Sequence, residues 1–160
     1  MSLYAQDTRV SVEQSRDEIE QLLKRYGADA FGYMTEAKGA AIQFKAGGRF
    51  LRFMLPMPTP DEVAKGPTGR RHPTGSLKRL MEKEQRRRWR SLALLIKAKL
   101  DAVASRIAVF EEEFMAHIIL PGNRTVAETA LPLIADAYKT GKVSGFLLPG
   151  IGETGGKDSE

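Results

Sequence analysis

The chain has 160 residues, 42% of them hydrophobic and 28% charged, and this balance indicates one folded domain with a single core. The absence of cysteine excludes disulfide frameworks, thiolate nucleophiles and cysteine-based zinc sites. The formal net charge is +5, yet residues 65–99 contain twelve lysines or arginines against two acids, a local charge of +10. A basic middle segment within an acidic remainder indicates a polarised molecule rather than a uniformly basic one.

The first expected element is a helix that begins at Ser11 and ends at Gly27. Ser11 or Ser15 can cap it, and Ile19, Leu22, Leu23 and Tyr26 recur at helical spacing. From Ala30 to Leu55 the pattern changes to three short apolar runs that are separated by turn residues. Glycines at 47 and 48 suit a two-residue hairpin turn, so we expect a three-stranded antiparallel meander that stops at Pro56.

Residues 56–75 contain five prolines and three glycines, which predicts a mobile basic loop. A long helix follows from about Ser76 to Val103. Its apolar positions fall on one face, which we expect to face the core: Trp89, Leu92, Ala93, Ile96, Leu100 and Val103. The tryptophan could instead stack on a nucleobase, but its place at the centre of the apolar face favours a core position.

Two further helices are expected after the long one. Ile107, Phe110, Phe114 and Ile118 repeat at helical spacing, and Thr125 with Glu128 forms a capping box for a helix from Val126 to Lys139. We expect residues 1–10 and 149–160 to be flexible and 11–148 to form one domain, with the apolar run Phe146–Leu148 docked back on it. The expected fold class is α+β, with the meander covered by the N-terminal helix, the long basic helix and the two C-terminal helices.

The basic segment is the only candidate site that the residues predict. Arginine forks bond phosphate oxygens, and a row of cations along a helix suits a polyanion, although a solvated helix face is the plainer alternative. The candidate nucleic-acid contacts are Arg70, Arg71, Lys78, Arg79, Lys83, Arg86, Arg87 and Arg90. No nucleophile, phosphate-loop or paired-carboxylate pattern is present, so we expect neither an enzyme nor a cofactor.

Two weaker patterns favour structural explanations. Glu113 and His117 lie one helical turn apart and could bind a metal, but no third ligand group lies nearby in the sequence, so a salt-bridged or partly buried pair is the better interpretation. The glycines of Gly150–Gly155 match a dinucleotide-binding pattern, but only five residues follow them, too few for the helix that such a site needs.

Four segments together resemble a family of small uncharacterised proteins encoded in prophages and other bacterial mobile elements: VEQSRDEIEQLLKRYGADAF, RRRWRSLALLIKAKLDAV, FEEEFMAHIILP and RTVAE. The resemblance runs from about Val12 to Leu148, and the family has no established activity. It implies a bacterial cytoplasmic setting and a role in the biology of a mobile element.

These observations lead to two hypotheses. The first is a non-enzymatic nucleic-acid-binding accessory protein that contacts the phosphates of DNA or RNA. The second is a protein-interaction module that binds a host or phage protein or self-associates through its basic and acidic faces. A membrane partner is not expected, because the longest apolar run, Leu92–Ile96, is short and the apolar helix face is needed to cover the sheet.

Overall fold

The computed structural model describes residues 8–36, 39–65 and 73–143. Its helices and strands follow one another in the order expected for an α+β domain. They are α1 (Val12–Arg25), β1 (Ala30–Glu36), β2 (Gly39–Ala46), β3 (Arg49–Pro56), α2 (Pro60–Ala64), the 3-10 turn η1 (Thr74–Ser76), α3 (Leu77–Ala104), α4 (Phe110–Phe114), the 3-10 turn η2 (Met115–His117), β4 (Ile119–Leu120), β5 (Arg124–Thr125) and α5 (Val126–Thr140). The fold-class prediction is confirmed.

The three long strands form an antiparallel meander in the order β1-β2-β3. The β2–β3 turn consists of Gly47 and Gly48, which have φ angles of 57° and 73°. Glycine is favoured at both positions because the left-handed region carries no Cβ penalty for it. The turn fixes the register in which Ala46 pairs with Arg49 and Phe44 with Leu51.

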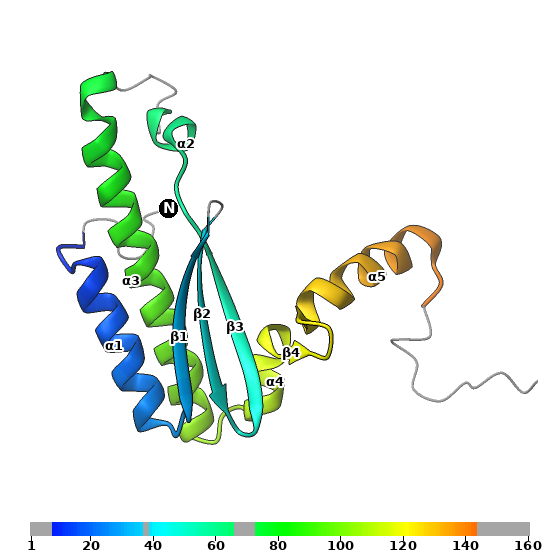
Figure 1. The fold of residues 1–160 in the computed structure, drawn as a ribbon. Helices are drawn as coiled ribbons and strands as arrows, with labels where there is room; N and C mark the ends of the chain where they lie inside the picture. The colour runs from blue at the N-terminus through cyan, green and yellow to red at the C-terminus, as the bar shows by residue number, and fades with distance from the viewer. Residues whose placement is uncertain (1–7, 37–38, 66–72, 144–160) are drawn as a thin grey trace, which may run out of the picture.

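One face of the sheet is covered by α1 and α3, which lie side by side (Figure 1). The buried core is formed by apolar side chains from both helices and from alternate positions of β2 and β3, with Phe114 of α4 closing one end. Trp89 is 2% exposed, as its place on the helix predicts. Its ring meets Tyr33 edge-on at 5.8 Å, and the guanidinium carbon of Arg16 lies 4.4 Å from its centroid.

The opposite face of the sheet has no helical cover among the described residues. Met34, Phe50 and Met54 on this face are 37%, 55% and 48% exposed. Helix α5 extends away from the sheet and from α3 (Figure 1), and its main contacts with the rest of the chain are to η2 and β5. The fold therefore leaves apolar surface open on the sheet and along α5.

The predictions differ from the structure at two places within the described residues. The helical pattern through Ile107 and Ile118 produces only the five-residue helix α4, because the chain then turns to pair Ile118 with Leu51 and to form the β4–β5 hairpin. Residues 56–75, expected to be a loop, contain α2, where Thr59 and Glu62 form a capping box. The predictions for residues 1–7, 66–72 and 144–160 lie outside the described residues.

Candidate nucleic-acid interface

Helix α3 positions all six of the described candidate residues. It runs for 28 residues and buries Trp89, Leu92, Ala93, Ile96 and Leu100 against the sheet. Its first turns extend past the ends of the strands (Figure 1). The lysines and arginines therefore divide into those beside the core, in the middle of the helix, and those on the projecting N-terminal half.

The cations beside the core are bonded to acids from several elements. Arg90 donates to the carboxylate of Glu18 and so ties α3 to α1. Lys99 donates to the carboxylate of Glu113 at 2.7 Å and ties α3 to α4. Both cations contribute to the packing of the helical layer, and their charge is balanced locally.

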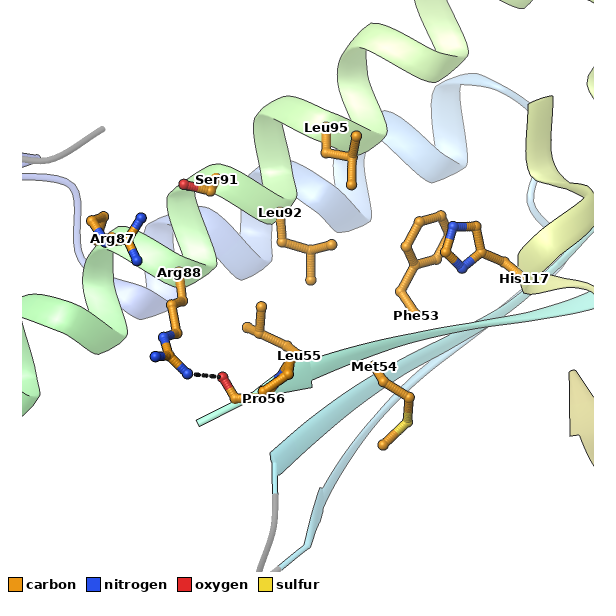
Figure 2. A pocket seen from close by; sticks show the side chains of 10 residues that line it. All are labelled: Phe53, Met54, Leu55, Pro56, Arg87, Arg88, Ser91, Leu92, Leu95 and His117. Carbon is orange, nitrogen blue, oxygen red and sulfur yellow. Dashed lines mark hydrogen bonds between the residues drawn. The ribbon is translucent and has the colours of Figure 1, made fainter. Parts of the chain in front are cut away.

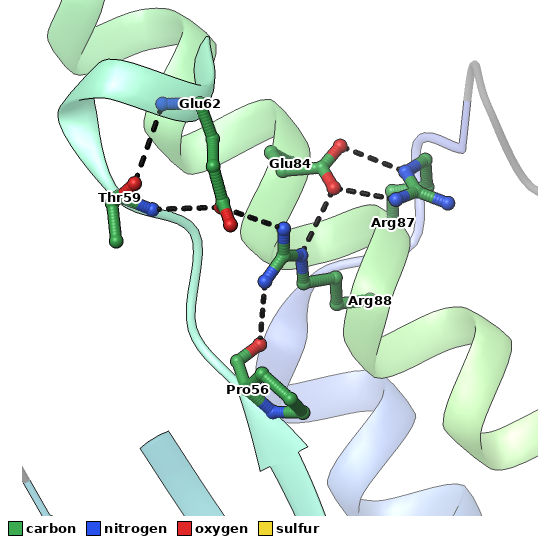
Figure 3. Close-up of polar contacts among 6 residues, drawn as sticks. All are labelled: Pro56, Thr59, Glu62, Glu84, Arg87 and Arg88. Carbon is green, nitrogen blue, oxygen red and sulfur yellow. Dashed lines mark hydrogen bonds and ion pairs between the residues drawn. The ribbon is translucent and has the colours of Figure 1, made fainter. Parts of the chain in front are cut away.

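Arg87 and Arg88 belong to a cluster of polar contacts at the end of β3 (Figure 3). Arg87 donates its Nε–H to Glu84 at 2.7 Å, and Arg88 donates to Glu84 at 3.0 Å and to Glu62 of α2 at 2.9 Å. Arg88 also donates to the carbonyl of Pro56 at 2.8 Å, where β3 ends. The hydrogen bond from Arg87, together with the one from Arg88, holds the pKa of Glu84 below its ordinary value, despite the opposing effect of burial. Two arginines and two glutamates thus form a neutral cluster that connects α2, β3 and α3.

Three of the four exposed cations of α3 lie in its N-terminal half, the fourth being Lys97. Lys78, Arg79 and Lys83 are exposed, and Arg86 is half-buried. The first turn of α3 contains no acid. From Arg79 to Arg86 the helix axis advances about 10 Å, a length over which one strand of a duplex carries about three phosphates along the duplex axis. This end of α3 can meet successive phosphates from one side.

The structure thus divides the eight candidate residues into three groups. Lys78, Arg79, Lys83 and Arg86 lie together on the projecting half of α3, whereas Arg87 and Arg90 are engaged by Glu84 and Glu18. Arg70 and Arg71 lie outside the described residues.

The sequence does not predict all the acidic partners of the arginines of α3. The pairing of Glu84 with Arg87 and Arg88 follows the helical spacing of three and four residues and could have been found. Glu18 lies 72 residues from Arg90, and no local pattern connects the two.

Glu113 and His117, the pair considered as metal ligands, contact other groups of the fold. His117 stacks on Phe53 with ring centroids 3.7 Å apart, and Glu113 bonds to Lys99. Among the described residues, no group of three or more potential ligands could hold a metal ion. Within the same residues, no helix combines the length and apolar character needed to cross a membrane.

Comparison with protein-family models, with curated proteins and with solved structures finds no match to this chain.

Proposed function

We propose that this protein is a non-enzymatic nucleic-acid-binding accessory protein, cytoplasmic and encoded by a bacterial mobile element. The observation that carries the proposal is the exposed set Lys78, Arg79 and Lys83 on the projecting half of α3, with no acid in its first turn. Arg86 supports these residues from the same half of the helix, and Arg70 and Arg71 precede it in the chain. The bacterial and mobile-element setting rests on the family resemblance of the sequence.

The proposed contacts are electrostatic and independent of base sequence. Each lysine or arginine that meets a phosphate releases condensed counterions, so the affinity falls as salt rises, with a slope of about −0.9 per phosphate on B-DNA. Arg87 and Arg90 bond to Glu84 and Glu18, so this part of the basic segment stabilises the fold.

The test is fluorescence anisotropy with four labelled oligonucleotides, single- and double-stranded DNA and RNA, across a salt series. Replacing Lys78, Arg79 and Lys83 together by glutamine should weaken binding and flatten the salt slope by about 2–3 units on duplex DNA. Binding to none of the four probes at low salt would rule the function out.

A matched control separates a local site from general charge. Arg49, Lys139 and Lys142 are also exposed but lie on β3, on α5 and just after α5. Their triple glutamine variant has the same change in net charge and should keep nearly the wild-type slope. Equal effects of the two triple variants would contradict a site on α3.

A second candidate function, protein interaction, is favoured by the uncovered apolar surface of the sheet and of α5. It predicts a defined oligomer or protein complex that survives nuclease treatment, measured by light scattering after size-exclusion chromatography. A monomer at all concentrations, with no bound protein, would exclude this candidate.

A further inference from the structure

Strand β3 forms an edge of the sheet, and the helical layer extends beyond it. Two packed helices cover about 16–20 Å, whereas three strands cover about 14 Å, so α1 and α3 leave space for about one more strand. Beside the first half of β3 this space is occupied, because Ile118 pairs with Leu51 and the ring of His117 stacks on Phe53.

Beside the second half of β3 the space is open. A groove of about 360 Å³ lies between α3 and β3 (Figure 2). Its walls are mainly apolar, with Leu92 and Leu95 on α3 and Phe53 and Leu55 on β3. We call this hollow the fourth-strand groove; it is lined by Phe53, Met54, Leu55, Pro56, Arg87, Arg88, Ser91, Leu92, Leu95 and His117.

The main chain of β3 presents hydrogen-bonding groups at the same place. In a two-residue hairpin the pair next to the turn, Ala46 and Arg49, is hydrogen-bonded, and bonded pairs then alternate along the ladder. This alternation directs the N–H and C=O of Met54 away from β2, to the free edge. Within the described residues these two groups have no hydrogen-bond partner, whereas the carbonyl of Pro56 accepts from Arg88. The edge thus offers one donor and one acceptor to an incoming strand.

We propose that the fourth-strand groove binds the segment Gly145–Leu148 of a second copy of this chain as an added β-strand. The proposal deepens the second candidate function, self-association, and is independent of nucleic-acid binding. In an extended segment, Phe146 and Leu148 project to the same side and can enter the groove together. Pro149 restricts Leu148 to extended conformations and ends the pairing because it has no N–H.

The length of chain explains why the strand comes from a second copy. Helix α5 starts at the β4–β5 hairpin and extends away from α3 (Figure 1), over about 22 Å for its 15 residues. The five residues from Gly141 to Gly145 span at most about 17 Å, which is shorter than α5 itself. We therefore assign the added strand to a second copy.

The surface of α5 is consistent with a partner at this place. Leu131, Ile134 and Tyr138 recur at spacings of three and four and are 61%, 37% and 89% exposed. A helix of this length is marginally stable in water without tertiary packing. When a second copy binds the segment in its groove, the apolar surface of that copy also comes close to Leu131, Ile134 and Tyr138.

The test uses engineered cysteines, because the native chain has none. Leu95 is 46% exposed in the groove wall, so Leu95→Cys should fold normally. When Leu95→Cys protein is mixed with Leu148→Cys protein under mild oxidation, we expect disulfide-linked heterodimers. Ile107→Cys, at an exposed position away from the groove, replaces Leu95→Cys in the control mixture and should give none.

Light scattering on the 160-residue chain gives a second, independent measurement of dimer formation. Phe146→Asp and Leu95→Glu should each raise the dimer dissociation constant by about tenfold or more, as loss of an apolar anchor does. Ile107→Glu, an apolar-to-acidic change at another exposed site, should leave it unchanged. A monomeric wild-type chain, a dimer unaffected by Phe146→Asp, or a crosslink that forms only within the Leu95→Cys/Leu148→Cys double variant would overturn the proposal.

Discussion

The surroundings of His117 in the fold change the pKa of its side chain. The ring stacks on Phe53 at the end of the core, where it is half-buried. Burial, reinforced by the positive charge of Lys99, lowers the pKa of the imidazole from its ordinary value of 6.5. The fold therefore favours the neutral form of His117, and protonation favours the unfolded chain.

This lowered pKa predicts a pH dependence of stability. Between the folded and unfolded pKa values of His117, the unfolded chain binds more protons, so the free energy of unfolding falls as the pH falls below about 6.5. Urea denaturation from pH 7.5 to 5.5 should show this fall for the wild type and a weaker one for His117→Gln. Identical profiles for wild type and His117→Gln would contradict the prediction.

At the scale of elements, Arg88 joins three segments that are distant in the chain. Its guanidinium bonds to Glu84 of α3, to Glu62 of α2 and to the Pro56 carbonyl at the end of β3 (Figure 3). The side chain is 20% exposed, so these bonds are partly shielded from water. Arg88 therefore connects both α2 and the end of β3 to α3.

Removing this arginine should destabilise the fold. Arg88→Ala removes the donor to the Pro56 carbonyl and one of the donors to each of Glu62 and Glu84. We expect the free energy of unfolding to fall by about 1.5–3 kcal/mol, measured by urea denaturation. Arg79→Ala, an exposed arginine on the same helix, should change it by less than about 0.5 kcal/mol. Equal effects of the two substitutions would show that the cluster contributes no more than an exposed charge.

The elements that the sequence predicts correctly are those with long, unambiguous periodicity. Helix α1 has its cap and apolar spacing, α3 has a continuous apolar face, and the meander has glycines where positive φ is needed. The pattern through Ile107 and Ile118 led to a wrong prediction, because apolar residues keep helical spacing beyond the end of α4. There Ile118 pairs with Leu51 instead of continuing the helix. The prolines around helix α2 favoured a loop at this place, although Thr59 and Glu62 have the spacing of a capping box.

At the scale of the whole molecule, stability depends on a single core between the sheet and the helices. Ile96 is fully buried at its centre, whereas its neighbour Lys97 is exposed. Ile96→Ala should lower the free energy of unfolding by about 2–5 kcal/mol, and Lys97→Ala should change it by less than about 0.5 kcal/mol. Urea denaturation checks both values. A loss below about 1 kcal/mol for Ile96→Ala would show that the core is loosely packed.

The sequence predicts where positive charge is concentrated but not how much of it is available to a partner. Of the residues from Arg86 to Arg90, Arg87, Arg88 and Arg90 bond to acids, and two of these acids come from other elements of the fold. Such pairings depend on how α1 and α2 dock against α3, which composition and periodicity do not specify. The projecting half of α3 could be recognised only once the ends of the strands were located.

The environment of Trp89 gives this protein a built-in optical probe. Trp89 is the only tryptophan, and its ring touches Tyr33 of β1 and the guanidinium of Arg16 of α1. Its emission therefore reports whether α1, β1 and α3 remain assembled, without any label. A titration with oligonucleotide can follow this signal while anisotropy follows the ligand, so that association is distinguished from opening of the core in one cuvette.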